Sequence, residues 1–266
     1  HVQDRLPRLI NVSQPSKTDT ITLVIGERRV HLIARKKITL GRSRENDICL
    51  RFLPRTPEND DGSRGISKTH VAFTLSSDGL GITDERSTHG VDIDCDRVEN
   101  THQLTHHDAQ GTRHIDLPAQ SSSTKISLQM ELNVFGRDPG DPNSASEFDW
   151  DDICFEATGE SPSSPWHIAK NCGIESTRIR RLNNLVDEEY VFLYRHATIG
   201  RSAKDHTISL PHDNKSSGEV RILYAGRMFW IHSTGEVALA VDGESIVGPC
   251  LIPLKFGHHL SINGID

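Results

Sequence analysis

Three short segments in the first half of the chain contain the residue types that bind phosphate groups. They are Gly41-Arg42-Ser43, Ser67-Lys68-Thr69-His70 and Ser87-Thr88-His89-Gly90. A phosphorylated side chain brings a charge of about −1.5 to −2 and three strong acceptor oxygens. An arginine meets it with a planar fork of donors, a serine hydroxyl adds one donor, and a lysine adds a point charge. Arg42, Ser67 and Lys68 therefore predict an anion site, provided that the fold brings them together.

Short β-strands are the elements that must position these segments. Apolar and polar residues alternate in runs separated by turn residues, at residues 20–25, 29–33, 37–40, 71–75, 81–83 and 126–135. Short strands with frequent turns are typical of β-sandwiches and barrels. Each segment falls at the end of such a run, so we expect it in a loop, where binding groups usually lie. The stretch 51–65, which leads to Ser67, is predicted as a long polar loop.

The strand pattern occurs again in the second half of the chain. Thr39–Ser43 matches Thr198–Ser202, and Ile48–Leu50 further along matches Ile208–Leu210. Self-similarity of this kind indicates a duplicated structural unit. We therefore predict an all-β fold made of two tandem antiparallel β-sandwiches.

The predicted sandwiches occupy residues 8–136 and 174–266. Between them, residues 137–173 form a predicted acidic, mostly irregular linker. Its first part is rich in Pro, Gly and Asp, which do not sustain regular structure, and its composition suits a solvated segment. Residues 165–170 are compatible with a single helical turn.

The composition narrows the classes of partner. The chain has 266 residues and a formal net charge of −7, whereas nucleic-acid binders normally carry a basic excess. No run of about 18 apolar residues is present, so no segment is predicted to span a membrane. The five cysteines form no C-x-x-C pair, which favours reduced thiols in a cytoplasmic protein. A local basic patch on an acidic chain favours a charged peptide as partner.

Taken in order, the three segments resemble a forkhead-associated (FHA) domain, whose pattern runs Gly-Arg, then Ser-x-x-His, then Ser-Thr-Asn-Gly. The resemblance covers about residues 20–135. It implies an FHA/SMAD-like sandwich that acts as a phosphopeptide-binding adaptor. The implied partner is a phosphothreonine-containing protein, either a Ser/Thr kinase or a kinase substrate. The resemblance implies no enzymatic activity, no catalytic residue, no cofactor and no metal.

The same resemblance assigns roles to five binding residues. Arg42 and Ser67 are implied to bind the phosphate, with Lys68 beside them adding a contact. Thr88 is implied to bind the peptide backbone near the phosphothreonine. The family's asparagine, which grips the peptide main chain, is replaced by His89, and an imidazole has no bidentate amide geometry.

Three further residues are implied to support the site. His70 is expected to brace the binding loops through hydrogen bonds of its imidazole. Gly41 and Gly90 are expected to permit tight backbone geometry.

The second copy keeps fewer of these residues. Arg201 and Ser216 form a possible weak second phosphate site, but Glu219 stands where the first copy has His70. No Ser-Thr-Asn-Gly segment follows. We therefore predict a degenerate FHA-like sandwich with a structural role or a role in self-association. For the whole chain, the alternative function is a phosphate-independent structural or dimerisation module.

A hydrolase is a weaker alternative, built on Ser67, His70 and Asp84 as a nucleophile, a base and an orienting acid. The sequence contains no Gly-x-Ser-x-Gly nucleophile elbow, and Ser67 and His70 lie only three positions apart.

A metal site is a further weak alternative, suggested by four histidines close together in sequence. They are His102, His106, His107 and His114. No Cys or Glu accompanies them at the spacing of a closed four-ligand zinc site.

Overall fold

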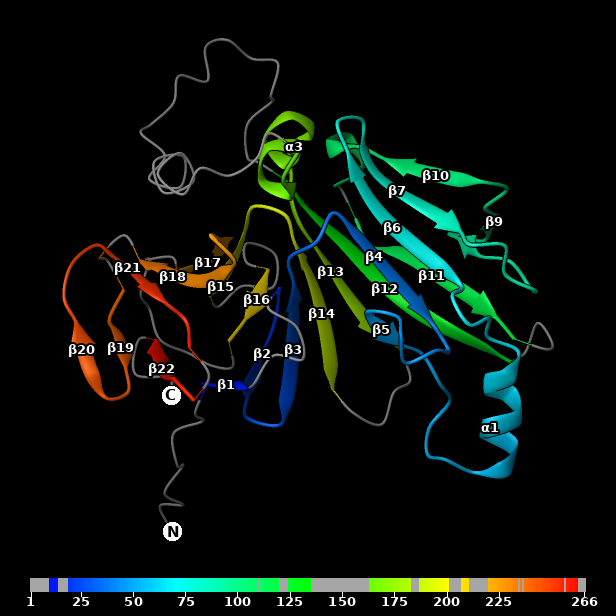
Figure 1. Ribbon diagram of the computed structural model, residues 1–266, viewed down its shortest axis with the longest axis horizontal. Helices are drawn as coiled ribbons and strands as arrows, with labels where there is room; N and C mark the ends of the chain where they lie inside the picture. The colour runs from blue at the N-terminus through cyan, green and yellow to red at the C-terminus, as the bar shows by residue number, and fades with distance from the viewer. Residues whose placement is uncertain are drawn as a thin grey trace.

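The computed structural model describes residues 10–13, 19–109, 111–119, 124–134, 163–182, 187–200, 207–210, 220–233, 235, 237–255 and 257–262 (Figure 1). Its strands form one long sheet and two shorter ones. The long sheet has 12 strands in the order β20 (Glu244–Ile246), β19 (Leu239–Val241), β22 (His259–Ile262), β1 (Ile10–Ser13), β2 (Thr20–Ile25), β3 (Arg28–Ile33), β14 (Glu188–Leu193), β13 (Ile174–Arg181), β12 (Lys125–Val134), β11 (Arg113–Pro118), β8 (Asp92–Ile93) and β9 (Asp96–Arg97).

Each of the two shorter sheets has five strands. The first has the order β10 (Thr101–Leu104), β7 (Gly79–Asp84), β6 (Val71–Ser76), β4 (Lys37–Gly41) and β5 (Ile48–Cys49). The second has the order β16 (Ile208–Ser209), β15 (His196–Gly200), β17 (Val220–Ala225), β18 (Met228–Ser233) and β21 (Cys250–Pro253).

The prediction of an all-β fold is confirmed. In the described part of the chain the helices are α1 (Pro57–Arg64), α3 (Pro165–Cys172) and one 3-10 turn, His106–Ala109. The strand pairs are mostly antiparallel, but β3 and β14, β4 and β5, and β15 and β16 pair in parallel. Each of the three sheets thus contains one of these parallel pairs beside its antiparallel ones.

Two hydrophobic cores fill the space between the long sheet and the two shorter sheets. The alternation seen in the sequence places apolar side chains inside, as in β2, where Ile21, Leu23 and Ile25 are buried. The first core gathers residues of β4 to β12, such as Phe73. The second core gathers residues of β15 to β22, such as Ile222.

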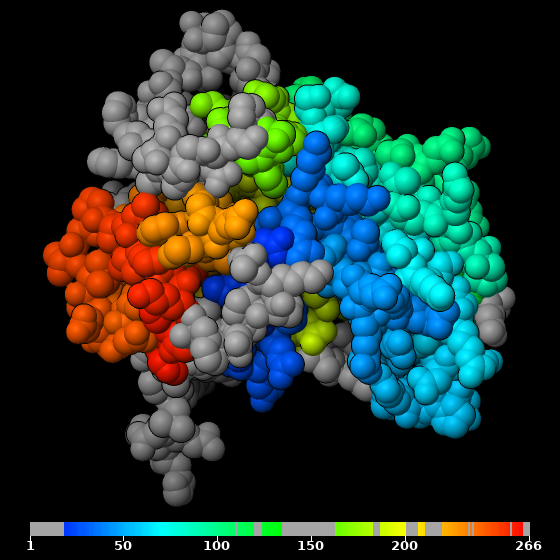
Figure 2. Space-filling model, viewed as in Figure 1, coloured from blue at the N-terminus to red at the C-terminus, as the bar shows by residue number. Residues whose placement is uncertain are grey.

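The two halves of the chain exchange hairpins. Ile179 and Phe192 of the β13–β14 hairpin, which follow the linker in sequence, belong to the first core. Conversely, Leu23 and Val30 of the β2–β3 hairpin, near the start of the chain, belong to the second core. Figure 1 shows the crossing at the centre of the molecule, and in Figure 2 the dark blue N-terminal residues adjoin the red C-terminal ones. That residues 8–136 and 174–266 form separate units stays a prediction, and the shared sheet argues against it.

The two exchanged hairpins meet at a seam where β3 pairs in parallel with β14, and there Leu32 lies opposite Val191. A carboxylate with 2% side-chain exposure, Glu189, lies in this seam. It pairs with Arg180 at 3.2 Å and with Arg28 at 3.7 Å. Removing one partner of such a buried pair is strongly destabilising, so the seam is specified by charge as well as by packing.

Helix α1 replaces the polar loop predicted for residues 51–65. Thr56 caps its start by accepting a hydrogen bond from the Asn59 N–H at 3.2 Å, and Pro57 occupies the first turn. The buried Ser63 hydroxyl accepts the Phe52 N–H at 2.9 Å, which ties the helix back to the preceding segment. Neither α1 nor α3 has the length and apolar content needed to cross a bilayer.

Candidate functional site

Arg42 leaves the end of β4 and is held by the segment that carries Ser67. Its backbone N–H donates to the Ser67 carbonyl oxygen at 2.9 Å, and its side-chain Nε donates to the Ile66 carbonyl oxygen at 3.0 Å. Within the described residues, no group accepts a hydrogen bond from the two terminal nitrogens of this guanidinium. The guanidinium is thus fixed through Nε, while its two terminal nitrogens can bind an anion.

Ser67 joins the Arg42 segment to the loop that follows β7. Its hydroxyl oxygen accepts the Thr88 backbone N–H at 3.0 Å and lies 3.5 Å from the Thr88 hydroxyl oxygen. Because the Ser67 hydroxyl is used as an acceptor, its own proton remains available for a further oxygen. The structure therefore brings Arg42, Ser67 and Thr88 together, although they are 46 positions apart in sequence.

His70 lies beneath these loops with no exposed surface. Its Nδ1 accepts the Ser67 backbone N–H at 3.2 Å, so the ring proton belongs on Nε2, which then donates to the Gly90 carbonyl oxygen at 2.9 Å. Burial lowers the pKa of His70, which favours this neutral form. The brace expected from the sequence connects the two loops that carry Ser67 and Thr88.

Both predicted glycines lie where a side chain would clash. A Cβ at Gly41 would strike the Lys68 carbonyl oxygen and lie 2.8 Å from the Thr69 Cα. Gly90 has a φ of +79°, and a Cβ there would overlap the Arg97 guanidinium. Close backbone approach at Gly41 and a left-handed turn at Gly90 are what bring the site loops together.

Lys68 and His89 lie at the edge of the site. Lys68 is exposed, while its carbonyl oxygen accepts the Ser43 N–H at 3.0 Å and the Asn46 side-chain amide at 2.6 Å. The carbonyl oxygen of His89 accepts from the Arg97 guanidinium at 2.7 Å, which fixes the backbone but not the imidazole.

Sequence reasoning missed two residues that shape this site. Asn46 is buried and clamps the Arg42 loop to Lys68, and Arg86, which has a φ of 56°, adds a cation at the Thr88 loop. A buried asparagine in a tight turn has no distinctive spacing, so only the folded loop reveals it.

The cations around the site have no carboxylate partners in the described part of the chain. These are Arg42, Arg44, Lys68 and Arg86. By contrast, Lys37 pairs with Glu85 at 2.7 Å, and Arg64 pairs with Asp61 at 3.2 Å. Unpaired cations on a chain with a net charge of −7 create a local positive field, which attracts an anionic ligand.

The second copy repeats the local geometry of the first. The Leu210 N–H donates to the Gly200 carbonyl oxygen at 2.7 Å, as the Leu50 N–H donates to that of Gly41 at 2.8 Å. The parallel pairs β15–β16 and β4–β5 are also alike. Arg201 and Ser216, the predicted weak second site, lie outside the described residues.

The hydrolase alternative does not match the geometry at Ser67. His70 contacts the backbone N–H of Ser67 and not its hydroxyl, and both ring nitrogens of His70 are occupied by backbone groups. The Asp84 carboxylate accepts the Ser87 N–H at 2.7 Å, so it shapes a turn and does not orient a base.

The histidine-rich segment shows one close pair. The rings of His106 and His107 lie 3.9 Å apart, and His102 and His114 lie on β10 and β11. Among the residues with described positions, no group of three or more His, Cys, Asp or Glu is placed to hold a metal ion.

Comparisons with known proteins gave a match to a family model and a match to a solved structure. No curated protein matches the chain. Among solved structures, Mycobacterium tuberculosis EmbR in complex with low affinity phosphopeptide matches with 17% sequence identity and a TM-score of 0.24. That match covers 42% of this chain and 22% of the solved chain, so this chain spans about a fifth of that protein. The family model of the FHA domain matches residues 38–109, the segment that contains Arg42, Ser67, His70 and Thr88.

Proposed function

We propose that the site around Arg42 binds phosphothreonine peptides of partner proteins, and that the chain acts as a signalling adaptor and not as an enzyme. The observation that carries the proposal is the meeting of Arg42, Ser67 and Thr88 in one site, where the described residues leave the two terminal nitrogens of the Arg42 guanidinium without an acceptor. The match of residues 38–109 to the FHA domain supports the same function.

The donors of the site suit the chemistry of a phosphate. The two free nitrogens of the Arg42 guanidinium can bind two phosphate oxygens, a geometry that adds specificity as well as energy. The Ser67 hydroxyl donates to a third oxygen while it accepts from Thr88. Lys68 and Arg86 lie nearby and raise the positive potential.

The peptide main chain is proposed to lie along the Thr88–His89 segment. Thr88 is exposed, and among the residues with described positions its hydrogen-bond partner is Ser67, while His89 is held through its backbone carbonyl oxygen. Because His89 replaces an asparagine amide, we expect fewer main-chain contacts and a moderate affinity.

The proposed partner is a Ser/Thr kinase or a kinase substrate, and the proposed setting is the cytoplasm. The described cysteines Cys49, Cys95, Cys172 and Cys250 are free thiols, which suits a reducing compartment.

Binding of a phosphothreonine peptide library to the intact chain and to Arg42→Ala tests the proposal. We expect the substitution to weaken binding by about 3 kcal/mol or more, or roughly a hundredfold in Kd. Arg64→Ala is the matched control, because Arg64 is an exposed arginine of α1 paired with Asp61. Equal binding by the intact chain and Arg42→Ala, or binding that does not need the phosphate, would support the structural or dimerisation module instead.

A further inference from the structure

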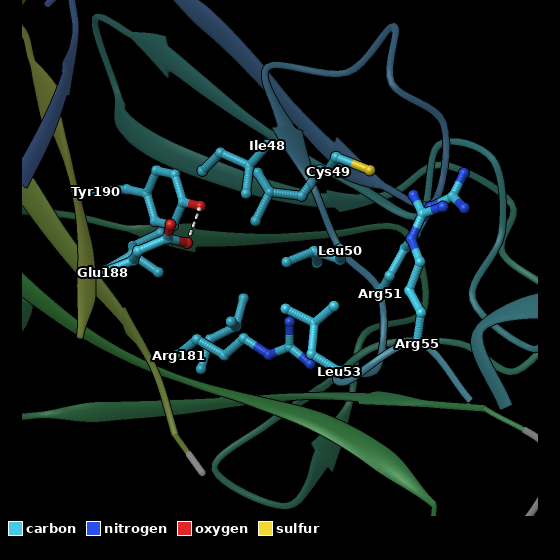
Figure 3. Close-up of a pocket in the computed structure, with 12 residues that line it drawn as sticks. Ile48, Cys49, Leu50, Arg51, Leu53, Arg55, Arg181, Glu188 and Tyr190 are labelled. Carbon is cyan, nitrogen blue, oxygen red and sulfur yellow. Dashed lines mark hydrogen bonds between the residues drawn. The ribbon is translucent and has the colours of Figure 1, made fainter. Parts of the chain in front are cut away.

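A cavity of about 150 Å³ lies beside the edge strand β5, between the first short sheet and the long sheet (Figure 3). Its inner wall is apolar and comes from buried side chains, among them Ile48, Leu50 and Ile179. A cavity of this size lined by apolar groups can hold a group about as large as benzene. The cavity therefore fits one apolar side chain of a bound partner.

Both halves of the chain build this cavity. Cys49, Arg51 and Leu53 come from β5 and the segment after it, whereas Arg181 and Tyr190 come from the exchanged hairpin β13–β14. Figure 3 shows Tyr190 on one side and Arg181 reaching toward Leu53 on another. The C-terminal half thus supplies a wall next to a site that belongs to the N-terminal half.

The rim of the cavity carries an excess of positive charge. Arg51, Arg55 and Arg181 line it, against the single carboxylate Glu188, which accepts the Tyr190 hydroxyl at 3.3 Å. In the described residues, the Arg181 guanidinium has no hydrogen-bond or ion-pair partner. Burial lowers the pKa of Arg181, a sign that its guanidinium is partly dehydrated. The Glu188 carboxylate acts on Arg181 electrostatically without an ion-pair contact, so a ligand carboxylate that makes such a contact would stabilise the guanidinium further.

The cavity borders the backbone of Arg42, a residue of the proposed phosphate site. The Arg42 carbonyl oxygen accepts a hydrogen bond from the Arg51 side chain at 3.3 Å and from the Cys49 thiol at 3.4 Å. Two residues of the cavity rim therefore contact the peptide group of Arg42 itself. The cavity thus lies next to the chain segment that carries Arg42.

We propose that this cavity binds an apolar side chain, flanked by a carboxylate, on the same peptide whose phosphothreonine binds Arg42. The inference rests on the proposed function and adds the sequence class of the partner. It also gives the second half of the chain a role in ligand selection that needs no phosphate site of its own.

A position-by-position phosphothreonine peptide library tests this inference. We expect one position to select Leu, Ile, Met or Phe next to Asp or Glu, and replacement of that anchor by Ala to weaken binding roughly tenfold. Leu53→Asp, Arg55→Gln and Arg181→Gln should reduce affinity for the anchor peptide and leave that of the Ala peptide unchanged. Leu53 and Arg55 are exposed, so their variants are expected to fold. The control Arg227→Gln alters an exposed arginine in the turn between β17 and β18.

The outcomes separate the two proposals. One outcome is that binding depends on Arg42 but the anchor and Ala peptides bind with equal affinity. Another is that the three rim variants do not reduce the difference in affinity between these two peptides. In either case the cavity inference is wrong and the proposed function stands. If the intact chain and Arg42→Ala bind phosphopeptides equally or not at all, both proposals are wrong.

Discussion

His70 shows how much of the site depends on single atoms. One neutral imidazole accepts from the Ser67 backbone and donates to the Gly90 backbone, so it fixes two loops that are distant in sequence. The ring contributes nothing directly to an anion. It positions the Ser67 hydroxyl and the Thr88 loop, which in turn border the free end of Arg42.

The burial of His70 predicts a dependence of stability on pH. The unfolded chain takes up a proton near the ordinary pKa of 6.5, whereas the folded state resists it because burial lowers the pKa. The free energy of unfolding should therefore decrease as the pH falls below about 6.5, by at most about 1.4 kcal/mol per pH unit for this residue. His31, which is half-buried and also has a lowered pKa, acts in the same direction.

Denaturant unfolding at pH 7.5 and 5.5, with an NMR titration of the imidazoles, measures this effect. A resonance of His70 that titrates at or above 6.5 would contradict the neutral brace. In His70→Gln the pH dependence should become shallower, since the contribution of the His70 imidazole is lost.

Substitution by alanine is expected to affect stability differently at two glycines, Gly41 and Gly62. Gly41→Ala should destabilise the chain by about 2 kcal/mol or more and abolish phosphopeptide binding, because its Cβ meets backbone atoms that cannot move aside. Gly62→Ala lies in helix α1 with its nearest atom at 3.4 Å, so it should be neutral or stabilise by up to about 1 kcal/mol. Thermal and denaturant unfolding of both variants checks the contrast, and equal effects at the two positions would refute it.

At the scale of elements, helix α1 is an example of a helix formed by a polar segment that was predicted to be a loop. It buries little apart from Ser63, so no apolar periodicity marks it in the sequence. Its start is specified by Thr56 as the capping residue and Pro57 in the first turn, followed by Glu58 and Asp60 at the positive end of the helix dipole. The helix lies in the segment that leads to Ser67 and contributes to the position of that residue.

Removal of the cap is the corresponding test. Thr56→Ala should destabilise the chain by about 1 kcal/mol, whereas Thr56→Ser, which keeps the hydroxyl oxygen, should cost much less. Amide exchange within residues 57–64 should accelerate in the alanine variant. Unchanged exchange there would mean that tertiary contacts such as that of Ser63, and not the cap, hold the helix.

Strands that bury alternate apolar residues could be predicted from the sequence, whereas a strand that buries polar residues could not. Residues 20–25 alternate in sequence and in burial, so their strand was identified. By contrast, Ile174–Arg181 places Ser176, Thr177 and Arg178 inside, where Arg178 pairs with Glu131 across the sheet. When polar residues are buried, the strand lacks the alternation of apolar and polar residues from which strands are predicted.

The site itself was more accessible to prediction than its surroundings. Arg42, Ser67 and Thr88 were proposed because their segments resemble the FHA pattern and fall at strand ends, and the structure brings the three residues together. The cavity beside β5 was not, because Arg181 and Tyr190 reach it only through the pairing of β13 with β12 and of β14 with β3. Pairing between distant strands is a property of the whole fold, which local patterns do not encode.

At the scale of the whole molecule, the exchange of hairpins makes the two halves depend on each other. Phe192 from β14 packs edge-on against Phe73 from β6, with ring centroids 5.2 Å apart, so the first core is filled from both halves. The β2–β3 hairpin does the same for the second core. The Glu189 seam couples the two exchanges, because its partners Arg28 and Arg180 come from one exchanged hairpin each.

This arrangement predicts how fragments behave. Residues 19–134 alone lack the β13–β14 hairpin, so Phe73 loses its contact with Phe192 and the edge of β12 is left unpaired, and the fragment should aggregate or unfold without cooperativity. Residues 19–195 include that hairpin and should regain a folded first core and Arg42-dependent peptide binding. Thermal unfolding, analytical ultracentrifugation and binding of one phosphothreonine peptide compare the two fragments with the intact chain. A monomeric, cooperatively folded 19–134 fragment with the affinity of the intact chain would show that the N-terminal half closes its own sandwich, and that the exchange is not required for the site.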